Sequence, residues 1–157
     1  MRRVISLFFK HFHRSIVVTS FDDNSFDLVF FNHALEHVRD VIAVMNEVHR
    51  ILRPGGRVVI QVPYFRCTDA YNDPTHTHFF AAQTLDYVTQ GTKLAEYHYS
   101  DKLFAKKGFW YGWPHVSHNP MRRVLKNWMH KHPRAYDQYI SLLLPTECLT
   151  WELEAVK

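Results

Sequence analysis

The chain has 157 residues, a length that fits one domain with a hydrophobic core of its own. Hydrophobic residues make up 46% of it and aromatic residues 15%, which excludes an intrinsically disordered chain. The net charge of +4 has its excess in residues 101–150, where eight Lys and Arg stand against three Asp and Glu. This bias favours anionic partners but is too weak for a dedicated nucleic-acid-binding protein, so no nucleic-acid partner is expected.

The two cysteines, Cys67 and Cys148, are far apart and form no metal-type spacing. They predict reduced thiols and a cytoplasmic location. No apolar run reaches the roughly 18 residues of a membrane span, so no span is expected.

Residues 1–19 form a divergent N-terminal segment, set apart from a main part that covers residues 20–157. Four apolar residues of the segment recur at helical spacing among basic residues: Ile5, Phe9, Phe12 and Ile16. This pattern predicts a short amphipathic helix packed on the domain, with docking to a membrane surface as the alternative.

The next 40 residues carry the clearest pattern. A turn cluster at residues 22–25 precedes an unbroken apolar run at 26–31, which is typical of a central strand buried on both faces. Apolar residues at helical spacing then predict a helix from about Asp40 to Leu52, ended by Pro54-Gly55-Gly56. A β-branched run at residues 57–62 predicts a second strand, parallel to the first through a right-handed crossover.

The remaining elements are predicted less sharply. Residues 82–90 indicate a short helix and residues 93–99 a strand, whereas residues 100–118 give no clear pattern. Helices are expected from Pro120, with Asn119 as the cap, and from Pro133. Apolar residues alternate from Leu149 to the end, which predicts a half-exposed, antiparallel final strand.

Residues 26–65, FDLVFFNHALEHVRDVIAVMNEVHRILRPGGRVVIQVPYF, resemble the class I S-adenosylmethionine-dependent methyltransferases often described as type 11. Two further stretches look like the acceptor-side segment and the last strand of that family: DPTHTHFFAAQTLDYVT at residues 73–89 and the closing LTWELEAVK. The resemblance implies part of a Rossmann-like, three-layer α/β domain with a mixed sheet and an antiparallel C-terminal strand. It also implies S-adenosylmethionine as the cofactor.

One part of the family pattern is absent from the sequence. Such enzymes begin with a strand, a glycine loop and an acidic residue that hold the cofactor, but all five glycines here lie at or beyond position 55. We therefore expect the C-terminal part of a methyltransferase domain without the N-terminal glycine-loop half. A truncated gene product, a mis-called start and a natural half-domain remain open, as does an inactive isolated chain.

The resemblance places the methionyl part of the cofactor beside Asn32, His33, Ala34 and His37. The alternative is that His33 and His37 only satisfy a helix start, with Asn32 ending the strand through its own backbone hydrogen bonds.

On the acceptor side, the resemblance points to Tyr64, Asp73 and His78 as substrate-binding residues and to His76 as the catalytic base. Histidine suits proton removal from a hydroxyl or amine near neutral pH. The alternative is a turn at residues 73–75 whose histidines bind the loop backbone.

The twelve histidines form i, i+2 pairs, but no pair joins a carboxylate or cysteine set with recognised ligand spacing, so no metal is expected. The expected function is methyl transfer to an unidentified small-molecule or glycan acceptor. A non-catalytic half-domain that binds a complementing chain or a second copy is the alternative. A nucleotide-sugar or NAD-dependent enzyme is disfavoured, since it too needs an N-terminal glycine loop.

Overall fold

The computed structural model describes residues 3–7, 19–113 and 120–157. Its strands and α-helices follow in the order β1 (Val4–Leu7), β2 (Phe26–Asn32), α1 (Val41–Ile51), β3 (Leu52–Pro63), α2 (Asp69–Asn72), β4 (Phe104–Tyr111), α3 (Pro120–Lys131), α4 (Pro133–Ala135) and β5 (Cys148–Ala155). Shorter turns of 3-10 or π type are η2 (Leu35–His37), η3 (Thr84–Val88), η4 (Ala95–Tyr97) and η5 (Tyr136–Ile140).

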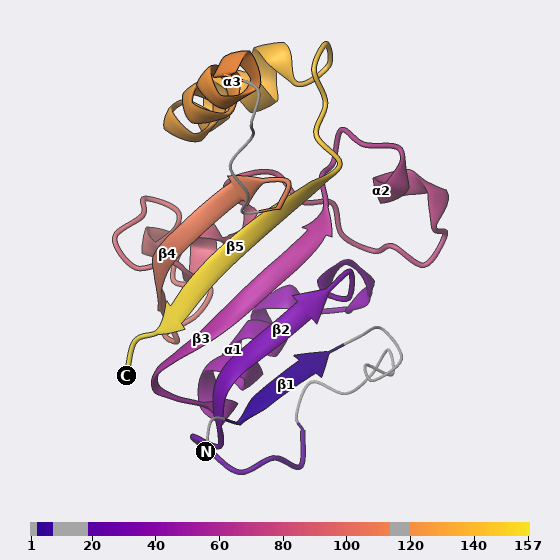
Figure 1. Ribbon diagram of the computed structural model, residues 1–157. Helices are drawn as coiled ribbons and strands as arrows, with labels where there is room; N and C mark the ends of the chain where they lie inside the picture. Colours follow the sequence, from indigo (N-terminus) through magenta and orange to yellow (C-terminus); the bar gives the residue numbers. More distant parts are fainter. Residues whose placement is uncertain (1–2, 8–18, 114–119) are drawn as a thin grey trace.

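One five-stranded sheet organises the described chain, in the order β1-β2-β3-β5-β4 (Figure 1). β1, β2 and β3 are parallel, whereas β5 is antiparallel to both β3 and β4. The predicted parallel pair is present, with Val29 opposite Val58 and Phe31 opposite Ile60. The mixed sheet and the antiparallel final strand are therefore confirmed.

Helix α1 forms the crossover between β2 and β3, as predicted. The Asp40 carboxylate caps it by accepting the Ala43 N–H at 2.9 Å. The chain turns extended at Leu52, and Gly55 supplies the positive φ of 72° that the following reversal needs. The apolar side of α1 packs on one face of the sheet, and its buried residues are Val44, Met45, Val48 and Ile51.

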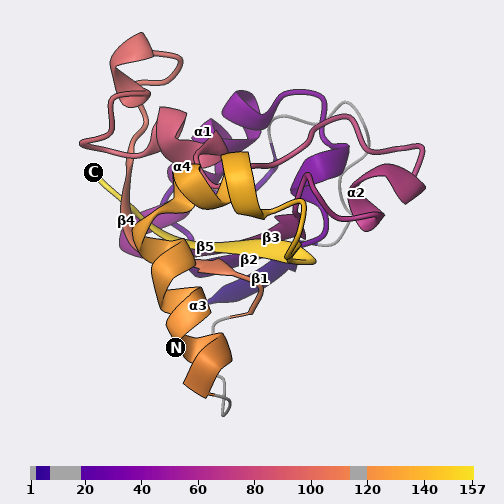
Figure 2. The same ribbon diagram turned by 90° about the horizontal axis from the view of Figure 1, so that it is seen from above.

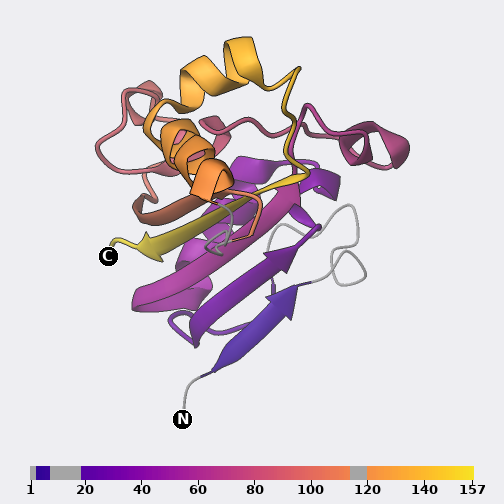
Figure 3. The ribbon, with the colours of Figure 1, turned by 45° about the horizontal axis from the view of Figure 1, so that its top comes forward.

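The opposite face of the parallel strands differs from the prediction. Along β2 only Val29 and Phe31 are buried, while Leu28 and Phe30 are half-buried. The expectation that this strand is buried on both faces is therefore wrong. The reason is visible in Figure 3, where no described helix lies in front of β1, β2 and the adjoining part of β3.

Three other expectations need correction. Val4–Leu7 is strand β1, paired with β2, and not part of a helix; residues 8–18, which hold the rest of that expectation, lie outside the described residues. The strand expected at residues 93–99 is instead the turn η4. The next strand of the structure is β4, which lies within residues 100–118, where the sequence gave no clear pattern. The helix expected at residues 82–90 is the 3-10 turn η3.

The C-terminal helices begin where they were predicted, at Pro120 and Pro133, although the expected cap Asn119 lies outside the described residues. Seen from above, α1 and α3 lie on opposite sides of the sheet (Figure 2). Helix α3 packs beside β4. Strand β5 is more deeply buried than expected, since Thr150 is 0% exposed.

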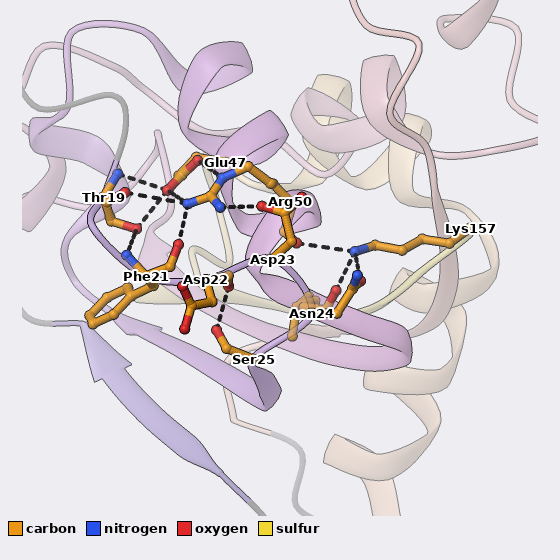
Figure 4. A network of polar contacts seen from close by, with 10 residues as sticks. Thr19, Phe21, Asp22, Asp23, Asn24, Ser25, Glu47, Arg50 and Lys157 are labelled. Carbon is orange, nitrogen blue, oxygen red and sulfur yellow. Dashed lines mark hydrogen bonds and ion pairs between the residues drawn. The ribbon is translucent and has the colours of Figure 1, made fainter.

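A network of hydrogen bonds and ion pairs links residues 19–25, which precede β2, to α1 and to the C-terminal residue (Figure 4). The buried Glu47 carboxylate accepts the Thr19 N–H at 2.7 Å and the Arg50 Nε–H at 2.8 Å. Arg50 also pairs with Asp23, and Lys157 donates to the Arg50 carbonyl at 3.1 Å. These hydrogen bonds hold the pKa of Glu47 below its ordinary value against the opposing effect of burial, so the carboxylate stays ionised.

Candidate active site

The predicted site residues gather at one edge of the sheet. β2 ends at Asn32 and β3 ends at Pro63, and because the two strands are parallel, both ends lie at the same edge. Ligands of open α/β sheets bind in the crevice outside the carboxyl ends of parallel strands. The loop after β2 and Tyr64 after β3 therefore occupy the expected place.

The loop after β2 turns sharply at His33, which has a φ of +47° and donates its N–H to the Gln61 carbonyl at 3.0 Å. The His33 side chain is 46% exposed. Ala34 and His37, by contrast, are buried. Of the four residues expected along the cofactor, Asn32 and His33 therefore have side chains within reach of a ligand.

Backbone hydrogen bonds join this loop to the segment expected on the acceptor side. The Glu36 carbonyl accepts the N–H groups of Thr77 at 2.9 Å and His78 at 3.2 Å. Thr77 Oγ1 donates to the Val38 carbonyl at 2.7 Å, and the His78 Nε2–H donates to the Arg39 carbonyl at 3.3 Å. Two segments about 40 residues apart in the sequence thus form one unit at the sheet edge.

A chain of hydrogen bonds fixes the tautomer of His37. The Thr75 hydroxyl donates to the Asp73 carboxylate at 2.7 Å, so it accepts from His37 Nδ1 at 2.9 Å. The proton of neutral His37 is therefore on Nδ1 and the lone pair on Nε2. Burial is the largest effect on His37 and lowers its pKa, which favours this neutral form.

His76 packs edge-on against His37, with ring centroids 4.6 Å apart. Its Nδ1 lies 2.9 Å from the Ala70 carbonyl oxygen, which only accepts, so Nδ1 carries the proton. Its Nε2 faces the Glu36 carboxylate, 3.9 Å from Oε1. The structure therefore brings His37 and His76 together and gives both the same tautomer.

Glu36 is the residue of this site that the sequence analysis missed. It is 1% exposed, and neither carboxylate oxygen has a hydrogen-bond partner among the described residues. The ring nitrogen His33 Nδ1 lies 3.6 Å from Oε1. The only signal in the sequence was its position in the LEH segment, because helical or strand periodicity does not mark a buried carboxylate in a loop.

Tyr64, which the resemblance assigned to substrate binding, lies in the core. It is 0% exposed and donates its hydroxyl to Asp137 Oδ1 at 2.7 Å. Tyr111 donates to the same oxygen at 2.8 Å, and the Ala82 N–H donates to the other at 3.1 Å. Burial raises the pKa of both tyrosines, so they stay protonated as donors, and Asp137 is a second polar residue that the sequence did not reveal.

Two hollows of the described surface lie away from these residues. One is at the start of the parallel strands, lined by Val4, Leu28 and Val59 among others, and the other lies between residues 83–94 and 131–135. Neither contains a predicted site residue. The carboxyl edge is the better candidate for a ligand site, because polar groups converge there and open α/β sheets bind ligands there.

The fold and the loop at the carboxyl edge define a Rossmann-like domain of the class I methyltransferase type. Residues 6–60 match the model of the methyltransferase-domain family, in agreement with the S-adenosylmethionine cofactor that the resemblance implies. The matched range begins within β1, so it includes most of the segment that the sequence analysis set apart as divergent.

Two curated relatives show how much of such a protein the chain covers. It is 28% identical over 101 residues to the Escherichia coli protein YafE, covering 57% of this chain and 49% of the relative. It is 31% identical over 102 residues to the ubiquinone/menaquinone biosynthesis C-methyltransferase UbiE of Desulfotalea psychrophila, covering 57% and 42%. The chain thus spans about half the length of the curated relatives it matches.

Solved structures support the fold. One comes from the complex between the Haloferax volcanii Trm112 methyltransferase activator and a methyltransferase. The TM-score is 0.53 at 15% sequence identity, and the match covers 88% of this chain and 58% of that chain. Another is the YcgJ protein of Bacillus subtilis, with a TM-score of 0.52, 16% identity and coverage of 90% and 68%. None of the helices in the described ranges has the length and apolar character needed to cross a bilayer.

Proposed function

We propose that this chain takes part in methyl transfer from S-adenosylmethionine and supplies the acceptor side and one rim of the cofactor site. The observation that carries the proposal is the hydrogen-bonded unit formed by residues 32–39 and 73–78 at the carboxyl edge of the parallel strands. Methyl transfer is an in-line displacement that requires donor and acceptor to be held in near-attack geometry. A rigid unit that combines both loops suits that requirement.

In this proposal Asn32, His33, Ala34 and His37 border the methionyl part of the cofactor. Asn32 and His33 do so with their side chains, whereas Ala34 and the buried His37 contribute backbone and support.

The acceptor lies on the side of Tyr64, Asp73 and His78. His76 accepts the proton of the acceptor, because its Nδ1–H is fixed on the Ala70 carbonyl and its lone pair is on Nε2. Asp73 and Tyr64 act through Thr75 and Asp137, to which their side chains are bonded.

The acceptor is a small molecule or a glycan. Relatives named demethylmenaquinone methyltransferase and sterol 24-C-methyltransferase support the small-molecule choice. The basic residues within positions 101–150 favour an acceptor with negative charge. The free thiols of Cys67 and Cys148 support a cytoplasmic location.

Because these residues hold no glycine before Gly55, this proposal takes the main grip on the cofactor from a complementing segment that carries a glycine loop. The alternative function is a non-catalytic half-domain that only binds such a chain. Strand β1 supports it, because it is the edge of the sheet and leaves one side without a strand partner among the described residues. The complex between the Haloferax volcanii Trm112 activator and a methyltransferase supports a role for a partner chain.

The test supplies the glycine loop in trans. The chain is mixed with a separately produced segment that carries the first strand and glycine loop of a relative. Transfer of labelled methyl groups is then measured on a panel of quinols, sterols and sugar phosphates. We expect His76→Ala to lower turnover strongly. The control His49→Ala should leave the turnover of folded protein unchanged, because His49 lies on α1 and its Nε2 is hydrogen-bonded to the Val156 carbonyl, away from the site. Equal turnover of the two variants removes His76 from the chemistry, and a stable complex without transfer favours the half-domain.

A further inference from the structure

The Glu36 carboxylate is buried without a hydrogen-bond partner among the described residues. It is 1% exposed, and among the described residues neither oxygen accepts a hydrogen bond. An ionised carboxylate away from water is strongly unfavourable unless it is paired, protonated or bound to a metal. Glu36 therefore needs a proton, a cationic partner or a metal ion.

The neighbouring histidines do not supply that charge in their neutral forms. His76 has its proton on Nδ1, so a lone pair on Nε2 faces Glu36 Oε1 at 3.9 Å. His37 has its proton on Nδ1 by the bond to Thr75, which also leaves a lone pair on Nε2. Electron-rich groups that converge in this way are the ordinary surroundings of a cation.

One ligand atom from each of Glu36, His37 and His76 lies within 4.8 Å of the others. Ligands placed about 2.0–2.1 Å from a tetrahedral zinc ion are about 3.3 Å apart. The group therefore needs to close by about 1.5 Å at most to reach this spacing.

We propose that Glu36, His37 and His76 bind a divalent cation of the zinc type. Two imidazole nitrogens and one carboxylate favour zinc over magnesium, which prefers oxygen ligands. The second shell also fits, since each histidine donates its other N–H to an oxygen, one to Thr75 Oγ1 and one to the Ala70 carbonyl.

A fourth position faces the exposed side of the site. His33 Nδ1 lies 3.6 Å from the same Glu36 oxygen, and its side chain is half-exposed. It either joins the cation or leaves a position open to water or to an acceptor oxygen, as catalytic zinc sites do. The i, i+2 histidine pairs of the sequence gave no hint of this group, because its members come from two separate segments.

The site changes the role of His76 when the cation is bound, because one lone pair cannot both hold a cation and accept a proton. This part rests on the proposed function. A hydroxyl acceptor bound to the cation has a lowered pKa and releases its proton to solvent. The resulting oxyanion attacks the methyl carbon, and the sulfonium leaves as a neutral thioether. Cation binding itself requires no methyl transfer.

The first experiment titrates the purified, metal-free chain with Zn²⁺ and separately with Mg²⁺ by calorimetry. We expect one tight Zn²⁺ per chain and no comparable binding of Mg²⁺. Glu36→Gln and His76→Gln should each weaken Zn²⁺ binding at least 10-fold. The matched control His78→Gln, on the same loop but bonded to the Arg39 carbonyl, should bind like the parent chain.

Two further measurements guard against misfolded variants. Glu36→Gln keeps the shape of the side chain and removes the unpaired charge, so the metal-free variant should melt no lower than the parent. X-ray absorption of the zinc-loaded parent should show nitrogen and oxygen ligands with imidazole scattering. Equal Zn²⁺ affinity of all variants, tighter Mg²⁺ than Zn²⁺ binding, or sulfur ligands from Cys67 or Cys148 would overturn the proposal. Cation binding without methyl transfer in the complemented enzyme would leave this site standing and refute the proposed function.

Discussion

Replacing Val48 with Asp tests the packing of the crossover on which the site depends. Val48 is 1% exposed and lies on the side of α1 that packs against the parallel strands. The change removes a buried apolar side chain worth about 1.5–3 kcal/mol. It also buries an unpaired carboxylate, which adds several kcal/mol. Because a domain of this kind is stable by only about 5–15 kcal/mol, most molecules should be unfolded or melt far below the parent.

Two variants make this result specific. Val48→Ala removes only two methyl groups and should cost about 2 kcal/mol, a lowering of the melting temperature of about 4–8 °C. Val124→Asp makes the same chemical change on α3, where the side chain is 68% exposed, and should stay within about 0.5 kcal/mol of the parent. Thermal melting followed by circular dichroism checks all three. If Val48→Asp melts within a few degrees of the parent, Val48 does not face the core.

Three further predictions concern the cofactor, a buried hydrogen bond and a turn. The chain alone should show no resolvable shift of its melting temperature with excess S-adenosylmethionine. A complete site, with cofactor at about 100 times its dissociation constant, would raise the melting temperature by about 5–11 °C. A rise of several degrees for the chain alone, confirmed by calorimetry, would contradict this prediction. Tyr111→Phe removes a donor to Asp137 and should cost about 1.5–3 kcal/mol in urea unfolding, while the exposed control Tyr139→Phe costs nothing measurable. Gly55→Ala should lower the stability by about 1–2 kcal/mol. The cost comes from the φ of 72° alone, because a Cβ at this position meets no atom within 4 Å. An unchanged stability would mean that the turn adopts another backbone conformation.

The crossover was predictable because its information is local. Periodicity placed α1 to within a residue, and the β-branched run placed β3, although β3 begins at Leu52 and so includes the Pro-Gly-Gly turn. The alternation of β5 was equally local, since one of its faces packs on the core. Each of these patterns reports which side of a single element is buried.

The misplaced strands depend on contacts between distant segments. In β1 the apolar residues also fit helical spacing, and only pairing with β2 decides for a strand. In β4 a bulge between Lys106 and Gly108 breaks the alternation, and Gly108 lies under the Trp110 ring, where a Cβ would be 2.1 Å from the nearest ring atom. Of the tyrosines expected in a strand at 93–99, Tyr99 instead stacks on Tyr87 with ring centroids 4.9 Å apart, and Tyr97 lies tilted against Tyr87 at 5.9 Å.

The candidate site was predictable in its position but not in its chemistry. The ends of two parallel strands mark the edge at which open α/β sheets bind their ligands, and the order of elements alone indicates this edge. The carboxylates that organise the edge, Glu36 and Asp137, carry no periodic signal, because their roles come from the residues that meet them in three dimensions.

The four residues that the resemblance assigned to the cofactor site differ in how exposed their side chains are. The side chain of His33 is nearly half exposed, that of Asn32 is half-buried, and Ala34 and His37 are enclosed. A ligand along this edge would therefore meet His33 and Asn32 directly. His37 would act on it through its contacts with the Thr75 hydroxyl and the His76 ring. The same contacts that make His37 a poor direct cofactor ligand make it a well-oriented cation ligand, since its Nδ1–H is fixed and its Nε2 keeps the lone pair.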